Sequence, residues 1–279
     1  LTPIRYVMTS PGLHTAFAGC AYLVVYVLPL YVVRGPRDSP PVIKARLAAT
    51  AITSALLTWV PIILAFSQSN GRLPRASEAA ALLGLTAHGF WSSVAQGLGL
   101  TALLFAGPLA YRALGAVPAH GPPRHVSRRS ALQVLRDLCL APLSEELVFR
   151  ASLLAFLRQR GLGAAAAVAA SLALFAAAHV HHLVDRVWHG GHSVRVALRA
   201  AALQAAYTAA FGLHAAALWT AGRSVAGPVA AHLACNLAGL PPLGAMLRHR
   251  QAPLLLLLTV MGVAGWARSI AWLFRRHAW

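Results

Sequence analysis

The chain has 279 residues, of which 58% are hydrophobic and only 11% are charged, and its mean hydropathy is +0.63. Because about a quarter of the residues in a soluble domain are charged, this composition excludes an ordinary soluble protein and favours one that spans a membrane. The formal net charge of +18 does not indicate nucleic-acid binding, since the basic residues form small groups between apolar runs, such as Arg34, Arg37, Lys44 and Arg46. We expect the anionic headgroups of the lipid bilayer, and no nucleic acid, to bind these basic groups. The groups occur in too many successive loops to assign the orientation of the protein in the membrane.

Nine apolar runs are candidates for membrane helices. A span needs about 20 apolar residues, so the runs at 78–92 and 224–240 are short; the first is a candidate re-entrant or interfacial segment, and Pro228 starts or kinks the second. No strand pattern occurs. We therefore predict an all-α, polytopic transmembrane bundle of about eight helices in one domain, residues 1–279. The runs cover roughly residues 12–33, 44–66, 78–92, 93–114, 131–157, 162–180, 197–221, 224–240 and 252–274.

The fifth run contains a pair of acids, Glu145 and Glu146, in a chain with only six acidic residues. A charged side chain at the centre of a bilayer costs about 2.5–3.5 kcal/mol, so such residues are expected to be paired or functional. Glu146 and Arg150 are four positions apart with the acid first, which favours an ion pair along one helix face. Glu145 lies about 100° around the helix and has no local partner. A buried carboxylate of this kind suits a general base.

Histidines follow in the sixth run and after it. Phe175 and His179 share a helix face, although a single histidine is more often a structural core residue than a ligand. Five histidines lie between His179 and His192, a density that is also found in metal sites. We expect most of these five to lie in a loop at the membrane surface, together with a loop pair formed by Asp185 and Arg186.

The eighth run brings His232 and Asn236 to one helix face. Two neutral donors in this arrangement are able to hold a developing oxyanion, and a hydrogen bond between membrane helices is the structural alternative. Two carboxylates, two histidines, an asparagine and an arginine then come from three apolar helices. This set is sufficient for activating water and polarising a carbonyl inside a membrane.

The three motifs occur in a recognisable order on separate helices. Glu-Glu-x-x-x-Arg, Phe-x-x-x-His and His-x-x-x-Asn together resemble the signature of the CAAX prenyl protease 2 family, the type II CAAX or Ras-converting endopeptidases of the wider abortive-infection superfamily. The stretches APLSEELVFRA and AHVHH resemble its eukaryotic members. The resemblance covers about residues 139–242, the expected catalytic core, whereas residues 1–130 match only as hydrophobic spans.

The resemblance implies an eight-helix, multi-pass protease of the endoplasmic reticulum membrane. Its expected substrates are proteins that end in a prenylated cysteine, farnesylated or geranylgeranylated, followed by three residues that the enzyme removes. Ras-type small GTPases are the expected clients.

The resemblance also assigns roles to the motif residues. Glu145, helped by His179, is expected to deprotonate the water that attacks the carbonyl of the prenylated cysteine, while His232 and Asn236 hydrogen-bond the oxyanion. Three residues support them: Glu146, paired with Arg150, orients the helix or His179, and Phe175 shapes the wall near His179.

Three alternatives stay open. No cofactor is required by this mechanism, but Glu145, His179 and His232 also form the His₂Glu set of many catalytic zinc sites, without the HExxH pattern. A non-catalytic membrane scaffold of the same superfamily would lack motif residues, and here all are present. A transporter would use buried Glu and His as a proton or metal relay, with ionisable residues spread along several spans.

Overall fold

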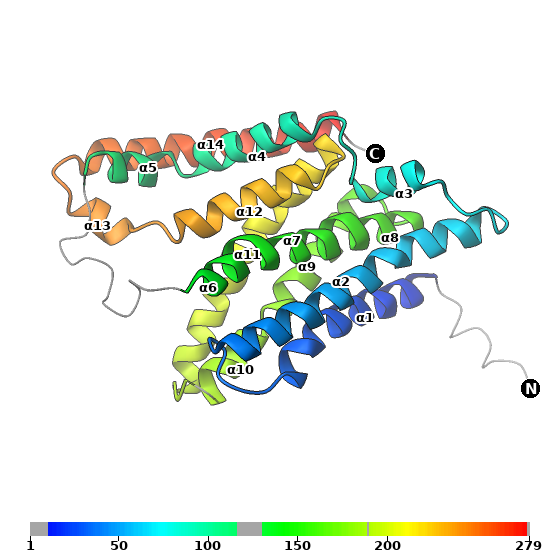
Figure 1. Ribbon diagram of the computed structural model, residues 1–279. Coiled ribbons are helices and arrows are strands. Elements are labelled where there is room, and N and C mark those ends of the chain that lie inside the picture. The colour runs from blue at the N-terminus through cyan, green and yellow to red at the C-terminus, as the bar shows by residue number, and fades with distance from the viewer. Residues whose placement is uncertain (1–10, 116–129, 189, 278–279) are drawn as a thin grey trace, which may run out of the picture.

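The structure, a computed structural model, describes residues 11–115, 130–188 and 190–277, and the regular secondary structure in these residues is entirely helical. Figure 1 shows long helices lying side by side, with shorter helices at their ends. The α-helices are α1 (Pro11–Val32), α2 (Pro40–Gln68), α3 (Ala76–Leu83), α4 (Phe90–Leu104), α5 (Ala106–Ala113), α6 (Ala131–Leu135), α7 (Ala141–Glu146), α8 (Leu153–Gln159), α9 (Ala164–Ala178), α10 (His181–Trp188), α11 (Val194–Gly222), α12 (Ala226–Ala238), α13 (Leu243–Leu247) and α14 (Ala252–Arg276).

Local sequence explains where several of these helices begin and end. Ser39 precedes α2 in an extended conformation and Pro40 occupies its first turn, where a missing N–H costs nothing. The helix α3 ends at Gly84, whose φ of 67° is left-handed and suits glycine. The N-cap Ser130 accepts a hydrogen bond from the backbone of Gln133, which fixes the start of α6.

One helix runs without interruption from α6 to α8 and contains two π-helical segments, η1 (Arg136–Leu140) and η2 (Leu147–Ser152). These segments flank α7, which carries the paired acids Glu145 and Glu146. Short π-helical segments within α-helices are frequent at functional sites.

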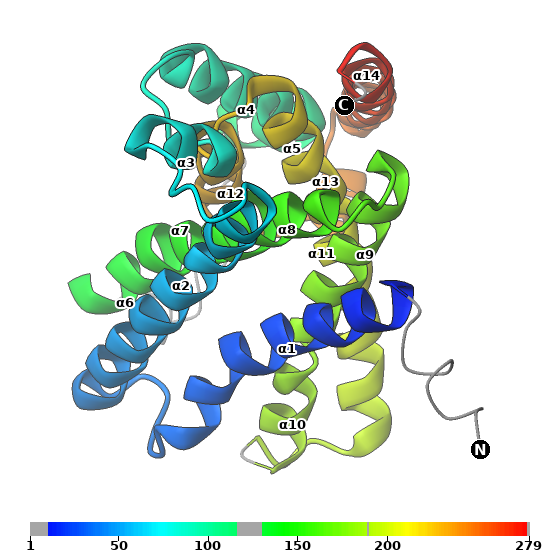
Figure 2. The ribbon, with the colours of Figure 1, turned by 90° about the vertical axis from the view of Figure 1, so that its right-hand side faces the viewer.

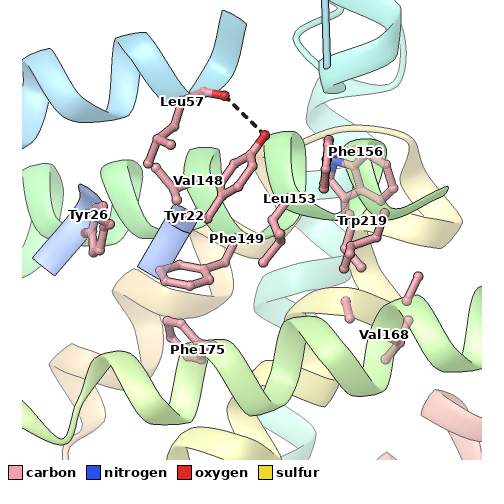
Figure 3. Close-up of a cluster of buried hydrophobic side chains, with 14 of the residues drawn as sticks. Tyr22, Tyr26, Leu57, Val148, Phe149, Leu153, Phe156, Val168, Phe175 and Trp219 are labelled. Atoms are coloured by element: carbon pink, nitrogen blue, oxygen red, sulfur yellow. Dashed lines mark hydrogen bonds between the residues drawn. The ribbon is translucent and has the colours of Figure 1, made fainter. Parts of the chain in front are cut away.

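This helix lies between two groups of helices. Figures 1 and 2 place α1 and α2 on one side of it and α4, α12 and α14 on the other, and α2 contacts η2 while α12 contacts α7. The core surrounds η2: Phe149 and Phe175 are almost fully buried and meet edge to face, 5.1 Å apart (Figure 3). At the same level Tyr22 of α1 donates a hydrogen bond to the carbonyl of Leu57 in α2. Glu146, Arg150 and Phe175 therefore lie in a densely packed part of the bundle.

The prediction of an all-α, polytopic membrane bundle is confirmed, whereas the number eight is not. Within the described residues, five helices are long and apolar enough to cross a membrane, and a sixth span arises if α4 and α5, bent by 77°, count as one. The five cover Thr15–Val32, Pro40–Gln68, Ala164–Trp188, Val194–Gly222 and Ala252–Arg276.

One candidate span is bent, and one expectation about a single element is wrong. The run 93–114 bends between α4 and α5. His181, His182, Asp185 and Arg186 do not lie in a loop, since α10 forms after a two-residue turn that ends α9. Amphipathic composition explains this helix: His181, His182 and Asp185 line a cavity, whereas Trp188 is exposed.

Candidate active site

Glu146, Arg150 and His232 form one buried network. The Glu146 side chain is 0% exposed; its Oε1 accepts a hydrogen bond from Arg150 Nη1 at 3.3 Å and lies 2.8 Å from His232 Nδ1. Arg150 Nε lies 3.2 Å from Oε2 in an ion pair that lacks hydrogen-bond alignment. A buried carboxylate is tolerated when it is paired and hydrogen-bonded in this way.

Glu145 occupies a different environment from its neighbour. Its side chain is 19% exposed, and its Oε2 lies 3.8 Å from His232 Nε2, beyond hydrogen-bond range. The same carboxylate lines a cavity. Glu145 is thus the acid that a water molecule or substrate is able to reach.

Hydrogen-bond partners determine which nitrogen of each histidine carries a proton. His179 Nδ1 lies 2.8 Å from the carbonyl oxygen of Phe175, which only accepts, so Nδ1 is the donor and Nε2 holds the lone pair of the neutral ring. His232 Nδ1 likewise faces the Glu146 carboxylate, and its Nε2 faces Glu145. A neutral His232 therefore accepts at Nε2, whereas a protonated one donates there.

Phe175 connects the ion network to His179. Its ring meets the His179 ring at 4.8 Å and nearly at right angles, and the guanidinium carbon of Arg150 lies 4.0 Å from its centroid. Phe211 of α11 adds a second ring, 4.5 Å from that of His232. These aromatic contacts hold both histidines in place.

The cavity beside Glu145 has a volume of about 160 Å³, more than enough for water. Its inner part is formed by Tyr26, Ser144, Glu145 and His179, with Tyr26 and Ser144 joined by a hydrogen bond of 3.0 Å. Its outer part lies among α10, the α1–α2 connection and the start of η1. The outer residues are Tyr31, Arg37, Arg46, Arg136, Asp137, His181, His182 and Asp185.

Acidic residues neutralise one of the cations at the outer end. Arg136 Nε lies 2.7 Å from Asp137 Oδ1, and its Nη1 lies 3.0 Å from Asp38 Oδ1. Burial alone would raise the pKa of Asp38, but the hydrogen bond and the positive charge of Arg136 outweigh burial and hold the pKa below its ordinary value. This ion group ties the α1–α2 connection to the helix that carries the acids.

Asn236 lies at the edge of the site. Its Nδ2 donates a hydrogen bond of 2.9 Å to the carbonyl oxygen of Asp137, and the residue is exposed. Neither Asn236 nor His232 lines the cavity that Glu145 and His179 share. The two proposed oxyanion donors thus sit on the α12 side of Glu145.

The arrangement does not fit a zinc ion. In the described parts of the chain, no three His, Cys, Asp or Glu side chains are grouped so that they could hold one metal. The trio of the zinc alternative, Glu145, His179 and His232, does not form such a group, so no step of the mechanism below involves a metal.

The structure differs from the sequence-based expectation in one contact and adds others. Glu146 contacts His232, 86 positions away, and not His179. The first half of the chain, expected only as hydrophobic spans, supplies Tyr26, Arg37 and Arg46 to the cavity. Nothing in the sequence distinguishes Arg46 from its neighbour Lys44 except its position around α2.

Comparison with known proteins places the motifs in a family. Residues 127–238 match the family model described as type II CAAX prenyl endopeptidase Rce1-like. The chain is 33% identical over 268 residues to CAAX prenyl protease 2 of Homo sapiens, covering 91% of this chain and 80% of that protein. The Rattus norvegicus protein of that name is 30% identical over 81% of the chain and 68% of its own length, and the Arabidopsis thaliana one 27% over 80% and 77%. No solved structure matches.

Proposed function

Because this chain belongs to the CAAX prenyl protease 2 family, we propose that it is an intramembrane endopeptidase that removes the last three residues of prenylated CAAX proteins. The expected substrates carry a farnesyl or geranylgeranyl group on the cysteine, as Ras-type small GTPases do. The observation that carries the proposal is that Glu145 of α7 and His179, in the turn that ends α9, line one cavity. We also propose the endoplasmic reticulum as the membrane in which the protein lies.

Glu145 and His179 activate water in this mechanism. The Glu145 carboxylate accepts a proton from a water molecule in the cavity, and the lone pair of His179 Nε2 orients that water. The resulting hydroxide attacks the carbonyl carbon of the prenylated cysteine. When the carbon–nitrogen bond breaks, the protonated Glu145 returns its proton to the amine of the leaving tripeptide.

His232 and Asn236 stabilise the oxyanion. Because His232 Nδ1 faces the Glu146 carboxylate, its Nε2 donates to the oxyanion only when both nitrogens are protonated. Glu146 then stabilises the imidazolium of His232. Arg150, which is paired with Glu146, supplies a second positive charge beside the two glutamates. Asn236 joins by exchanging the carbonyl oxygen of Asp137 for the oxyanion, and each donor is worth about 3–4 kcal/mol in the transition state.

Two peptides of the same CAAX sequence, one prenylated and one not, test the proposal. The purified protein in phosphatidylcholine vesicles should release the tripeptide from the prenylated peptide only, as measured by mass spectrometry. Glu145→Ala should release none while it keeps the unfolding transition of the wild type. Turnover by that variant at the wild-type rate would reject Glu145 as the base, and no release from either peptide would favour the non-catalytic scaffold.

A further inference from the structure

Two cations at the outer end of the cavity, Arg37 and Arg46, make no hydrogen bond or ion pair with a described acid, although the charge of Arg37 helps to lower the pKa of its neighbour Asp38. The guanidinium of Arg37 makes no hydrogen bond or ion pair with any residue that the structure describes. Arg46 is half-buried, and its Nε and Nη2 donate to the carbonyl oxygen of Val33 at 3.3 and 3.2 Å. These two bonds fix the orientation of Arg46 and leave its charge uncompensated by any described acid.

The other charged groups of the cavity differ from this pair. Arg136 is neutralised by Asp38 and Asp137, as described above. Asp185 interacts electrostatically with His181 on the same helix and is not free of partners. Glu145, at the inner end, is negative and repels a second anion. An anionic ligand in this cavity is therefore favoured at Arg37 and Arg46 and disfavoured beside Glu145.

From this charge distribution we infer that Arg37 and Arg46 bind the α-carboxylate at the C-terminus of the substrate. The inference rests on the proposed function, since a CAAX chain carries that carboxylate three residues beyond the scissile carbonyl. Three extended residues span about 10 Å. With its carboxylate on the arginines and the prenylated cysteine at Glu145, the substrate binds in one direction. The two arginines thus recognise that the chain ends after the third residue.

Lipid headgroups are the other ordinary partner of arginines near a helix end. The position of each residue in the molecule distinguishes carboxylate binding from headgroup binding. Arg34 and Lys44 belong to the same basic group, are exposed, and do not line the cavity, as expected of headgroup contacts. Arg37 and Arg46 line the cavity that holds Glu145 and His179. Arg34 and Lys44 therefore serve as matched controls.

The experiment compares a prenylated CAAX peptide that has a free C-terminal carboxylate with the same peptide as a C-terminal amide. Both are assayed in vesicles of phosphatidylcholine alone, which carry no net charge. The wild type should cleave the acid with a kcat/KM roughly tenfold or more above that for the amide, as a charge-assisted contact implies. Arg37→Gln/Arg46→Gln should bring this ratio close to one, whereas Arg34→Gln and Lys44→Gln should keep the wild-type ratio.

Turnover of the amide by the double variant shows that the variant is folded. If the double variant is inactive on both peptides, the single variant Arg37→Gln tests the inference instead. Arg37 is exposed and its side chain makes no hydrogen bond within the described chain, so this variant should fold. It should lower the acid-to-amide ratio of kcat/KM severalfold. Equal cleavage of acid and amide by the wild type would overturn the inference while leaving the proposed function intact. A wild-type ratio that survives in the Arg37→Gln and double variants would also overturn it, and cleavage of neither peptide would reject the proposed function.

Discussion

Adjacent glutamates on α7 differ in burial and partners, and we propose that this difference separates a role in stability from a role in catalysis. Glu146 is buried with Arg150 and His232, whereas Glu145 faces the cavity. Removing a partner of a buried carboxylate leaves a charge that nothing compensates, which typically costs about 3–5 kcal/mol. Removing the charge of a partly exposed carboxylate has no such cost.

We therefore expect Arg150→Met to lower the free energy of unfolding by about 3–5 kcal/mol, because it strands Glu146 and loses the stacking on Phe175. Denaturant titration in detergent measures this loss. Glu145→Gln, five positions earlier on the same helix, is the control: it should unfold like the wild type and release no tripeptide. Equal destabilisation by the two variants would contradict the division of roles.

Metal removal gives a second prediction for the motif residues. Glu145, His179 and His232 do not form a metal-binding group in the described chain, and the proposed base is a carboxylate acting on free water. Turnover of the prenylated peptide should therefore stay unchanged after dialysis against a chelator, and elemental analysis of active enzyme should find no stoichiometric zinc. Loss of turnover on chelation, with recovery on adding zinc, would establish the zinc alternative.

Sequence spacing reveals contacts within a helix better than contacts between helices. The Glu146–Arg150 pair and the Phe175–His179 contact follow from the i, i+4 spacing, because neighbours on one helix face are fixed by helix geometry. The contact between Glu146 and His232 depends on how α7 packs against α12. Such tertiary packing leaves no periodic pattern in the sequence.

At the scale of helices, α4 and α12 approach each other unusually closely. Gly97 and Ser93 of α4 face Gly227 of α12; Ser93 Oγ accepts a hydrogen bond from Gly227 N at 3.1 Å. A methyl group on Gly97 would overlap the backbone carbonyl of Gly227. Small residues allow this approach between membrane helices, and it positions the helix that carries His232 and Asn236.

Gly97→Ala should force the two helices apart. Overpacking of this kind costs about 1–3 kcal/mol, and displacing catalytic groups by about 1 Å lowers a rate roughly 100-fold. The expected result is a lower unfolding temperature together with a strongly reduced kcat/KM for the prenylated peptide.

Gly99→Ala provides the comparison in the same helix. A methyl group on Gly99 meets no described atom within 4 Å, so this variant should be as stable and as active as the wild type or slightly more stable. If Gly97→Ala behaves like Gly99→Ala, the close contact between α4 and α12 does not position the site.

Hydropathy located the helices but not their bends. The first and last spans were expected at 12–33 and 252–274, and α1 and α14 cover Pro11–Val32 and Ala252–Arg276. The turn after Ala178 and the bend after Leu104 were not foreseen, since a kinked apolar run and a straight one have the same composition. The π-helical segments around α7 escape a search for 3.6-residue periodicity for a related reason: they change the backbone register and leave the residue types unchanged.

At the scale of the whole molecule, the candidate membrane spans present many apolar side chains to the outside. In each candidate span, at most 28% of an 18-residue apolar stretch is buried within the molecule, although these stretches are strongly hydrophobic. Large apolar side chains are exposed on three different spans, including Phe17 at 78%, Trp59 at 57% and Val260 at 65%. A helix of 22 residues such as α1 is about 33 Å long, enough for a hydrocarbon core of about 30 Å.

This surface distinguishes two ways of holding the protein on a membrane. The formal charge of +18 attracts anionic headgroups, but 1 M salt screens this attraction beyond about 3 Å. Helices that are surrounded by lipid, in contrast, leave the membrane only when detergent replaces the lipid. We expect washes with 1 M salt or alkaline carbonate to leave the protein in the membrane pellet and detergent to extract it, as followed by immunoblotting. A basic peripheral protein in the same membranes should be released by the salt wash. Release of this chain by salt alone would show that charge holds it there, and the outward-facing apolar helices would then need a partner other than lipid.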